Sequence, residues 1–177
     1  MEVEGFVTIM PRRGVVVNAL TIQDVKNFYQ ICGALEGSVV TSVFDRFDGR
    51  HIAVMRQLNS EMRAAVHREE FDTYYKLNIQ FHDVFLNLSD NPLIRTMLMP
   101  LKRRLYDFQR RPYVKEWELR NTQEHDQFID SIKAGDLADA VRMLRDVHWS
   151  FSEQEGYIRA FHQRDAEANR SRNGTSP

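Results

Sequence analysis

From Thr21 to about Phe161, large apolar residues recur at the spacing of an amphipathic α-helix. Short turn signals such as "DRFDG" and "SDNP" divide this region into successive helical segments. A helix with one apolar stripe must bury it against neighbouring helices, and short connections make those neighbours antiparallel. The sequence therefore predicts an all-α fold, an antiparallel helical bundle of six or seven helices, preceded by a short β-hairpin.

The first twenty residues lack the helical spacing. The segments "GFVTIM" and "GVVVNAL" are rich in β-branched residues and flank the turn sequence "PRRG", which is typical of a β-hairpin. The C-terminal segment "DAEANRSRNGTSP" is polar and has no apolar period, which favours disorder. We therefore expect a hairpin over residues 1–20, a helical domain over 21–162 and a disordered tail over 163–177.

The first helix is predicted to open at Thr21, because "TIQD" is close to a capping box. The other predicted helices cover Arg50–His67, Phe71–Leu88, Pro92–Phe108, Trp117–Ala134 and Asp136–Phe151, the last with an extension towards Phe161. In the fourth of these helices, the spacing places the apolar residues Leu93, Met97, Leu101, Leu105 and Phe108 on one inward side.

The net charge and the cysteine count limit which classes of protein this sequence can belong to. The formal net charge of −1 gives no overall electrostatic basis for holding nucleic acid. Cys32 is the only cysteine, so an intramolecular disulfide is impossible and a cytoplasmic location is expected. No apolar run approaches the roughly 18–20 residues of a membrane span, so no membrane partner is expected.

Three of the predicted helices carry a histidine within their apolar stripe. Asn78 and His82 in "YYKLNIQFHDVF" are four residues apart and share the inward face of the third helix. His125 and His148 lie at similar distances from the turn between the fifth and sixth helices, so their rings should come within about one helical turn of the same height. The spacing therefore permits one shared site.

A single buried histidine is usually a hydrogen-bonded core residue, and that interpretation stays open for each of the three. Three imidazoles with one amide oxygen, however, suit a divalent metal such as Zn²⁺ or Ni²⁺. The pattern therefore indicates a metal site with Asn78, His82, His125 and His148 as its ligands.

The order of these motifs resembles a known family. "NIQFH", then "EH", then "AGDLADAVRMLRDVH", together with the turn "SDNPLI", are similar to the FCD ligand-binding domain of GntR-type bacterial transcriptional regulators, the FadR subfamily. The resemblance covers about Leu20 to Phe161. It also implies that the hairpin is the wing of a winged helix-turn-helix domain most of which lies outside this sequence. Arg12 and Arg13 would then stand at the wing tip as DNA contacts, although a solvated turn is the favoured alternative.

The resemblance implies a homodimer that senses a small molecule, and two residues depart from the family pattern. Asn78 stands where the family has an aspartate ligand, so the metal should bind more weakly. Cys32 stands where many members have an arginine that faces the effector. We expect a carboxylate effector held at the metal, with Asn121 as a further contact and Arg95, Arg103 or Arg104 as partners for its carboxylate.

Two other functions remain open from the sequence. A small metal-dependent enzyme would need a general base at the metal, and Glu124 is adjacent to His125. Successive helical residues point about 100° apart, so Glu124 is expected to face away from His82 and His148. A protein-interaction module with purely structural histidines is the third possibility. The favoured expectation is a regulator domain and not an enzyme.

Overall fold

The computed structural model describes residues 7–10, 14–17, 20–109 and 114–173 of the chain. Its main elements are α1 (Ile22–Val43), α2 (Gly49–His67), α3 (Phe71–Leu86), α4 (Pro92–Gln109), α5 (Lys115–Ala134), α6 (Leu137–Arg142), the π-helix η2 (Met143–His148) and α7 (Phe151–Asn173). A single 3₁₀ turn, η1 (Phe44–Arg46), joins α1 to the loop before α2. The predicted all-α bundle is confirmed.

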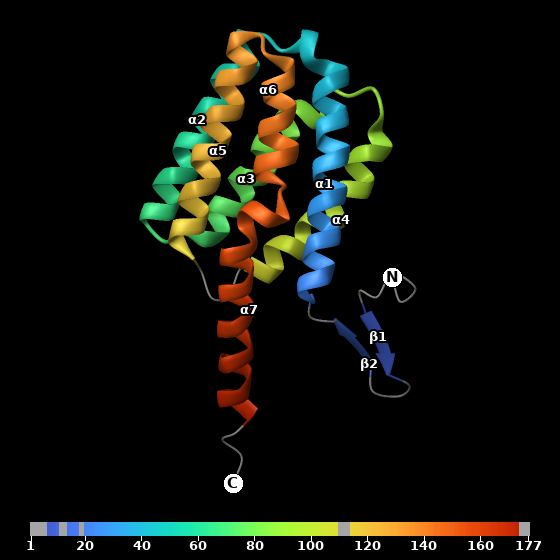
Figure 1. The fold of residues 1–177 in the computed structure, drawn as a ribbon, viewed down its shortest axis with the longest axis vertical. Helices are drawn as coiled ribbons and strands as arrows, with labels where there is room; N and C mark the ends of the chain where they lie inside the picture. The colour runs from blue at the N-terminus through green and yellow to red at the C-terminus, as the bar shows by residue number, and fades with distance from the viewer. Residues whose placement is uncertain (1–6, 11–13, 18–19, 110–113, 174–177) are drawn as a thin grey trace.

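Two short strands precede the bundle. β1 (Val7–Met10) and β2 (Gly14–Val17) are antiparallel, with Val7 opposite Val17 and Met10 opposite Gly14. In Figure 1 these strands lie beyond the end of α1 and outside the helical bundle.

Local capping explains where several helices begin and end. The backbone N–H of Asp24 donates to Thr21 Oγ1 at 3.1 Å, and the Thr21 N–H donates back to Asp24 Oδ2 at 2.9 Å, which completes the predicted capping box. At the other end of the bundle, Gly135 closes α5 with φ 73°, a left-handed conformation that glycine adopts without steric cost. The chain can therefore reverse sharply into α6.

α3 packs against α2, α1 and α4. α2 packs against α3 and α5, while α1 packs against η2 and α4. The core is rich in aromatic side chains, including Tyr74, Phe81, Phe85, Trp117 and Phe128. Buried aromatic rings contribute large apolar areas and hold the helices at fixed spacing around the polar groups described below.

α1 and η2 approach each other closely at Gly33. A Cβ atom at that position would meet the Trp149 Cβ at 3.0 Å and the Arg145 carbonyl oxygen at 3.3 Å. A larger residue would therefore push η2 away from α1. This close approach brings the last turn of η2 into the bundle core.

Three sequence predictions are wrong in detail. The helix predicted from Asp136 to Phe151 is divided, because η2 has π geometry and the chain breaks before α7. The tail predicted to be disordered from residue 163 is helical as far as Asn173, consistent with its alanine, glutamate and arginine residues, which favour helix. In α4, Leu93 and Met97 are 67% and 60% exposed, because the buried side is rotated by one residue towards Leu98.

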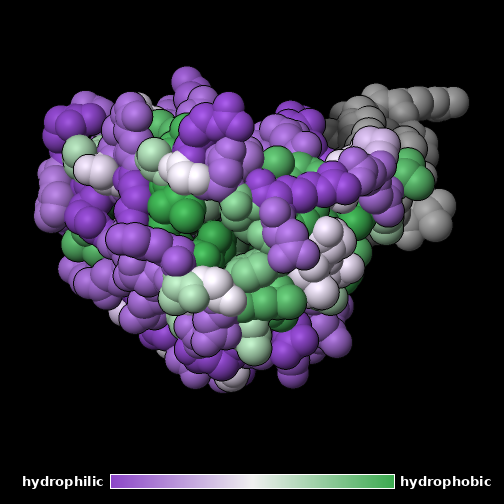
Figure 2. Space-filling view, turned by 90° about the horizontal axis from the view of Figure 1, so that it is seen from above, coloured by the Kyte–Doolittle hydropathy of each residue, from purple (hydrophilic) through white to green (hydrophobic). Residues whose placement is uncertain are grey.

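The protein surface is largely hydrophilic. Figure 2 shows hydrophilic residues around the rim of one end of the molecule and hydrophobic residues nearer its centre. Among the described helices, none combines the length and the apolar character that crossing a lipid bilayer requires.

Candidate metal centre

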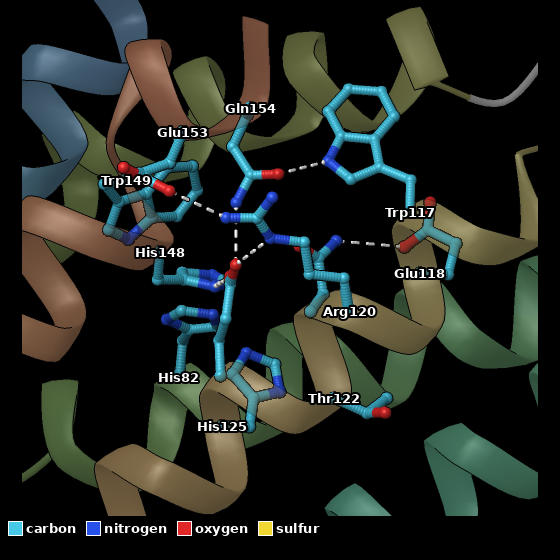
Figure 3. Close-up of polar contacts among 12 residues, drawn as sticks. His82, Trp117, Glu118, Arg120, Thr122, His125, His148, Trp149, Glu153 and Gln154 are labelled. Carbon is cyan, nitrogen blue, oxygen red and sulfur yellow. Dashed lines mark hydrogen bonds and ion pairs between the residues drawn. The ribbon is translucent and has the colours of Figure 1, made fainter. Parts of the chain in front are cut away.

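His82 from α3, His125 from α5 and His148 from the end of η2 meet inside the bundle, and we refer to these three residues as the histidine centre. One ligand atom of each lies within 4.8 Å of the others. The ring centroids are 4.8–5.4 Å apart, and all three side chains are buried. Figure 3 shows the rings arranged around a common point. The predicted meeting of the three histidines is confirmed.

Two buried carboxylates orient two of the rings. The Nδ1 atom of His82 lies 2.9 Å from Glu36 Oε2, and the Nδ1 atom of His148 lies 3.0 Å from Glu124 Oε2. An ionised carboxylate only accepts hydrogen bonds, so each neutral ring carries its proton on Nδ1. In the neutral form of each ring, Nε2 is therefore the unprotonated acceptor.

Both carboxylates are held in the ionised form. Burial alone would raise the pKa of Glu36, but His82 and Lys102 beside it hold that pKa well below the usual range. The pKa of Glu124 is also lowered despite burial, because His148, Arg120 and Gln154 donate hydrogen bonds to it. Ionisation of both groups supports the proton positions assigned to the rings.

The amide of Asn59 orients the third ring, that of His125. Asn59 Nδ2 donates to the Thr122 carbonyl oxygen and to Asp126 Oδ1, both at 2.8 Å. With its N–H₂ group used in this way, Asn59 presents its Oδ1 to His125 Nδ1 at 3.3 Å. His125 therefore also carries its proton on Nδ1 and has an unprotonated Nε2.

Two of the three histidines have a buried nitrogen that no group in the described residues satisfies. Among the described residues, the buried Nε2 atoms of His82 and His125 have no hydrogen-bond partner. Burial lowers the pKa of His82 to about 4 and that of His125 well below its usual value, so both rings are neutral at pH 7. Buried acceptors without donors are costly, and a divalent cation bound between them would satisfy both.

The two predicted asparagines are also buried. Asn78 lies one turn before His82 on the same face of α3, and its Oδ1 has no hydrogen-bond partner in the described part of the chain. Asn121, one turn before His125, donates to Glu118 Oε2 at 3.2 Å and to the Tyr74 hydroxyl at 3.4 Å. Asn78 thus offers an amide oxygen beside the histidine centre, whereas Asn121 belongs to a neighbouring polar cluster.

The predicted arginines differ in their exposure. Arg95 is exposed and forms a bidentate ion pair with Asp83 at 2.9 and 3.0 Å. Arg103 is exposed, and Arg104 is half-buried. Arg12 and Arg13, the predicted DNA contacts, lie outside the described residues.

The prediction that Glu124 faces away from His148 is wrong. The prediction considered only the angle between neighbouring residues on α5, whereas His148 reaches Glu124 from η2, with its Nδ1 atom 3.0 Å from Glu124 Oε2. Glu124 also accepts hydrogen bonds from Arg120 and Gln154, both at 2.9 Å. Its oxygens are therefore occupied in orienting His148 and are not placed to activate a water at the centre.

Sequence reasoning missed the residue that links the most elements here, Glu36. Besides the contact with His82, its carboxylate accepts from Trp149 Nε1 at 2.6 Å and from Lys102 Nζ at 2.5 Å. Glu36 and Lys102 are 0% and 1% exposed. A signal was present, because Glu36 lies four residues after the inward Cys32, and Lys102 lies four after Leu98.

Comparison with known proteins identifies the family of this chain. The family model described as the FCD domain matches residues 27–149. An HTH-type transcriptional regulator of Bacillus subtilis, YdhC, is 28% identical over 99 residues, which is 55% of this chain and 44% of that protein. A second HTH-type regulator, from the TAR-I ttuE–ttuC′ intergenic region of Agrobacterium vitis, is 25% identical over 49% of this chain and 52% of its own length. The chain thus matches about half the length of these relatives, which are named as regulators and not as enzymes.

Solved structures show the same fold. E. coli McbR/YncC superposes with a TM-score of 0.73 at 14% identity, over 89% of this chain and 77% of that one. Streptococcus agalactiae GntR superposes with a TM-score of 0.60 at 12% identity, over 87% of this chain and 77% of its own.

Proposed function

The chain belongs to the FCD domain family, and from this premise we propose that it is the effector-binding and dimerisation domain of a bacterial GntR-type transcriptional regulator of the FadR subfamily. In this proposal the domain binds a small carboxylate in the cytoplasm. Ligand binding favours one of two arrangements of the dimer and so changes DNA affinity.

The observation that carries the proposal is the convergence of three buried imidazoles, with one ligand atom of each within 4.8 Å of the others. His82, His125 and His148 would hold a divalent metal, with Asn78 as the oxygen ligand. Zn²⁺ or Ni²⁺ suits this set of donors. A bound metal would supply a Lewis-acidic position for a carboxylate oxygen.

Charge balance supports an anionic effector. Glu36 is paired with Lys102, and Glu124 is paired with Arg120, so neither carboxylate has a charge left for a metal. Histidine ligands and the amide of Asn78 add no negative charge. A divalent cation in this buried place therefore favours a ligand that brings its own negative charge.

Dimerisation is proposed from exposed apolar residues on helices that pack together. Leu93 and Met97 lie one turn apart on the outer side of α4, and Ile31 is 41% exposed on α1, against which α4 packs. We propose this surface as the contact between two copies. The paired β1 and β2 strands suit the wing of a DNA-binding domain, which would be the route of contact with DNA.

The proposal is tested by thermal melting of protein prepared without a metal-affinity tag. We expect Zn²⁺ or Ni²⁺ to raise the melting temperature of the wild type, and a carboxylate to raise it further only when metal is present. His125→Ala should abolish both shifts. His67→Ala, an exposed histidine on α2, is the matched control and should retain them.

A contrary result would be a metal-dependent shift that is the same in wild type and His125→Ala. The metal would then bind elsewhere, and the three histidines would be structural.

A further inference from the structure

The inner face of α4 carries a second polar pair that sequence reasoning did not identify. Lys102 and Tyr106 are four residues apart and therefore lie one turn apart on the same face. They are 1% and 8% exposed. Burying these two polar groups costs free energy, because each loses its hydration on folding. A compensating interaction is therefore expected.

Lys102 retains unused hydrogen-bonding capacity. An ammonium group has three N–H donors, and within the described residues Lys102 makes one hydrogen bond, to Glu36 Oε1 at 2.5 Å. Its Nζ also lies 5.5 Å from the centre of the Trp149 ring. The Glu36 pair accounts for the charge of Lys102 but leaves two donors without acceptors.

The Tyr106 hydroxyl also has unused hydrogen-bonding capacity. Its hydroxyl is buried and has no hydrogen-bond partner in the part of the chain that the structure describes. Burial, together with the nearby carboxylate of Glu36, raises the pKa of Tyr106 well above its usual value, so the hydroxyl remains a donor. A protonated phenol without an acceptor is suited to an oxyanion from outside the chain.

These donors lie beside the histidine centre. The Glu36 carboxylate touches His82 Nδ1 through one oxygen and Lys102 Nζ through the other. The Tyr106 ring lies 4.8 Å from the ring of Tyr75, which is one turn before Asn78 on α3. Glu36 thus connects Lys102 to the histidine centre, and its charge also reaches Tyr106.

We propose that Lys102 and Tyr106 form an anion-binding subsite that holds a second carboxylate of the effector and so selects dicarboxylates over monocarboxylates. The proposal rests on the function proposed above. In it, one carboxylate of the ligand meets the metal held by the histidine centre, and the other accepts hydrogen bonds from the Lys102 ammonium and the Tyr106 hydroxyl. Hydrogen bonds with a charged partner are strong enough for such discrimination.

The test is isothermal titration of the zinc-loaded protein with matched pairs of ligands. Malonate, succinate and glutarate would be compared with propionate, butyrate and valerate, the monocarboxylates of equal chain length. We expect at least one dicarboxylate to bind about tenfold or more tightly than its partner, the difference that a charged hydrogen bond supplies. Tyr106→Phe, which removes one oxygen only, should reduce this preference several-fold.

Lys102→Met should abolish the preference for dicarboxylates, and monocarboxylate affinity and zinc content are measured in the same variant to separate this loss from a change at His82. Because this substitution leaves Glu36 buried without its cation, the double variant Glu36→Gln/Lys102→Met provides a charge-balanced version for the same titration. Lys76→Met, which changes an exposed lysine on α3, is the matched control and should behave as the wild type.

Equal binding of both ligand classes by the wild type would overturn the subsite while leaving the metal-assisted sensor intact. A dicarboxylate preference that persists in Tyr106→Phe and in the double variant would overturn it as well. If the proposed function itself were wrong, the protein would bind neither zinc nor a carboxylate of either class.

Discussion

Replacing Glu36 by glutamine should destabilise the bundle strongly, because this one carboxylate joins α1 to three other elements. It accepts hydrogen bonds from His82 on α3, Lys102 on α4 and Trp149 after η2, at 2.9, 2.5 and 2.6 Å. Glutamine has nearly the same shape, so the substitution changes the charge and one acceptor and leaves packing almost unaltered.

The expected magnitude follows from the burial of the pair. Glu36 and Lys102 are 0% and 1% exposed, so removal of the carboxylate leaves an ammonium in the core without a counter-charge. Breaking a buried ion pair in this way costs about 3–5 kcal/mol. The reciprocal change, Lys102→Met, should cost a similar amount. The double variant Glu36→Gln/Lys102→Met should recover at least half of the loss, because no charge then remains buried alone.

Urea unfolding followed by far-ultraviolet circular dichroism, with metal removed by a chelator, gives the free energies for this double-mutant cycle. The reasoning would be refuted if Glu36→Gln cost less than about 1 kcal/mol, the range of exposed pairs. It would also be refuted if the double variant lost as much free energy of unfolding as the two single variants together.

Other perturbations follow from the same contacts. Burial lowers the pKa of His82 from 6.5 to about 4, so the unfolded chain takes up the proton first, and the free energy of unfolding should fall by up to about 3 kcal/mol as pH drops from 6.5 towards 4. Urea midpoints across that range measure the loss, which should be smaller in His82→Gln. Burial raises the pKa of Glu118 from 4.5 to about 7, so its contribution to stability is present below pH 4.5 and is lost as pH rises towards 7. Glu118→Gln should therefore gain stability relative to the wild type at pH 8 compared with pH 5, and equal differences at the two pH values would contradict this. Asn78→Asp adds a charged oxygen ligand and should tighten zinc binding by about tenfold, measured by competition with a chromophoric chelator. The double variant Leu93→Lys/Met97→Lys places charges on the proposed dimer surface and should shift sedimentation towards the monomer, whereas no change would place the interface elsewhere.

The helical bundle was predictable because its helices follow simple periodic and capping signals. The box formed by Thr21 and Asp24 and the left-handed Gly135 both occur where the sequence indicated a helix end. The π-helix was not predictable, since residue spacing carries no signal for its wider turn. The buried side of α4 was not predictable either. Apolar residues lie on adjoining sides of this helix, and the sequence favoured the side with Leu93 and Met97, which is exposed.

The candidate site was predictable only in its central residues. His82, His125 and His148 stand out because an imidazole interrupts an apolar stripe on three different helices. The groups that fix their protons come from elements distant in sequence, as with Asn59 on α2 and Glu36 on α1, so their pairing required the fold. Lys102 escaped notice because lysine is usually exposed, whereas here a buried carboxylate compensates its charge.

The central claim is that the histidine centre holds a divalent metal, and metal content measures this most directly. Protein purified without a metal-affinity tag would be assayed by mass spectrometry as wild type, His82→Ala and the exposed control His67→Ala. We expect about one zinc or nickel ion per chain in the wild type and the control, and almost none in His82→Ala. Equal metal content in His82→Ala and the wild type, or a wild type that stays metal-free after incubation with both ions, would contradict the claim.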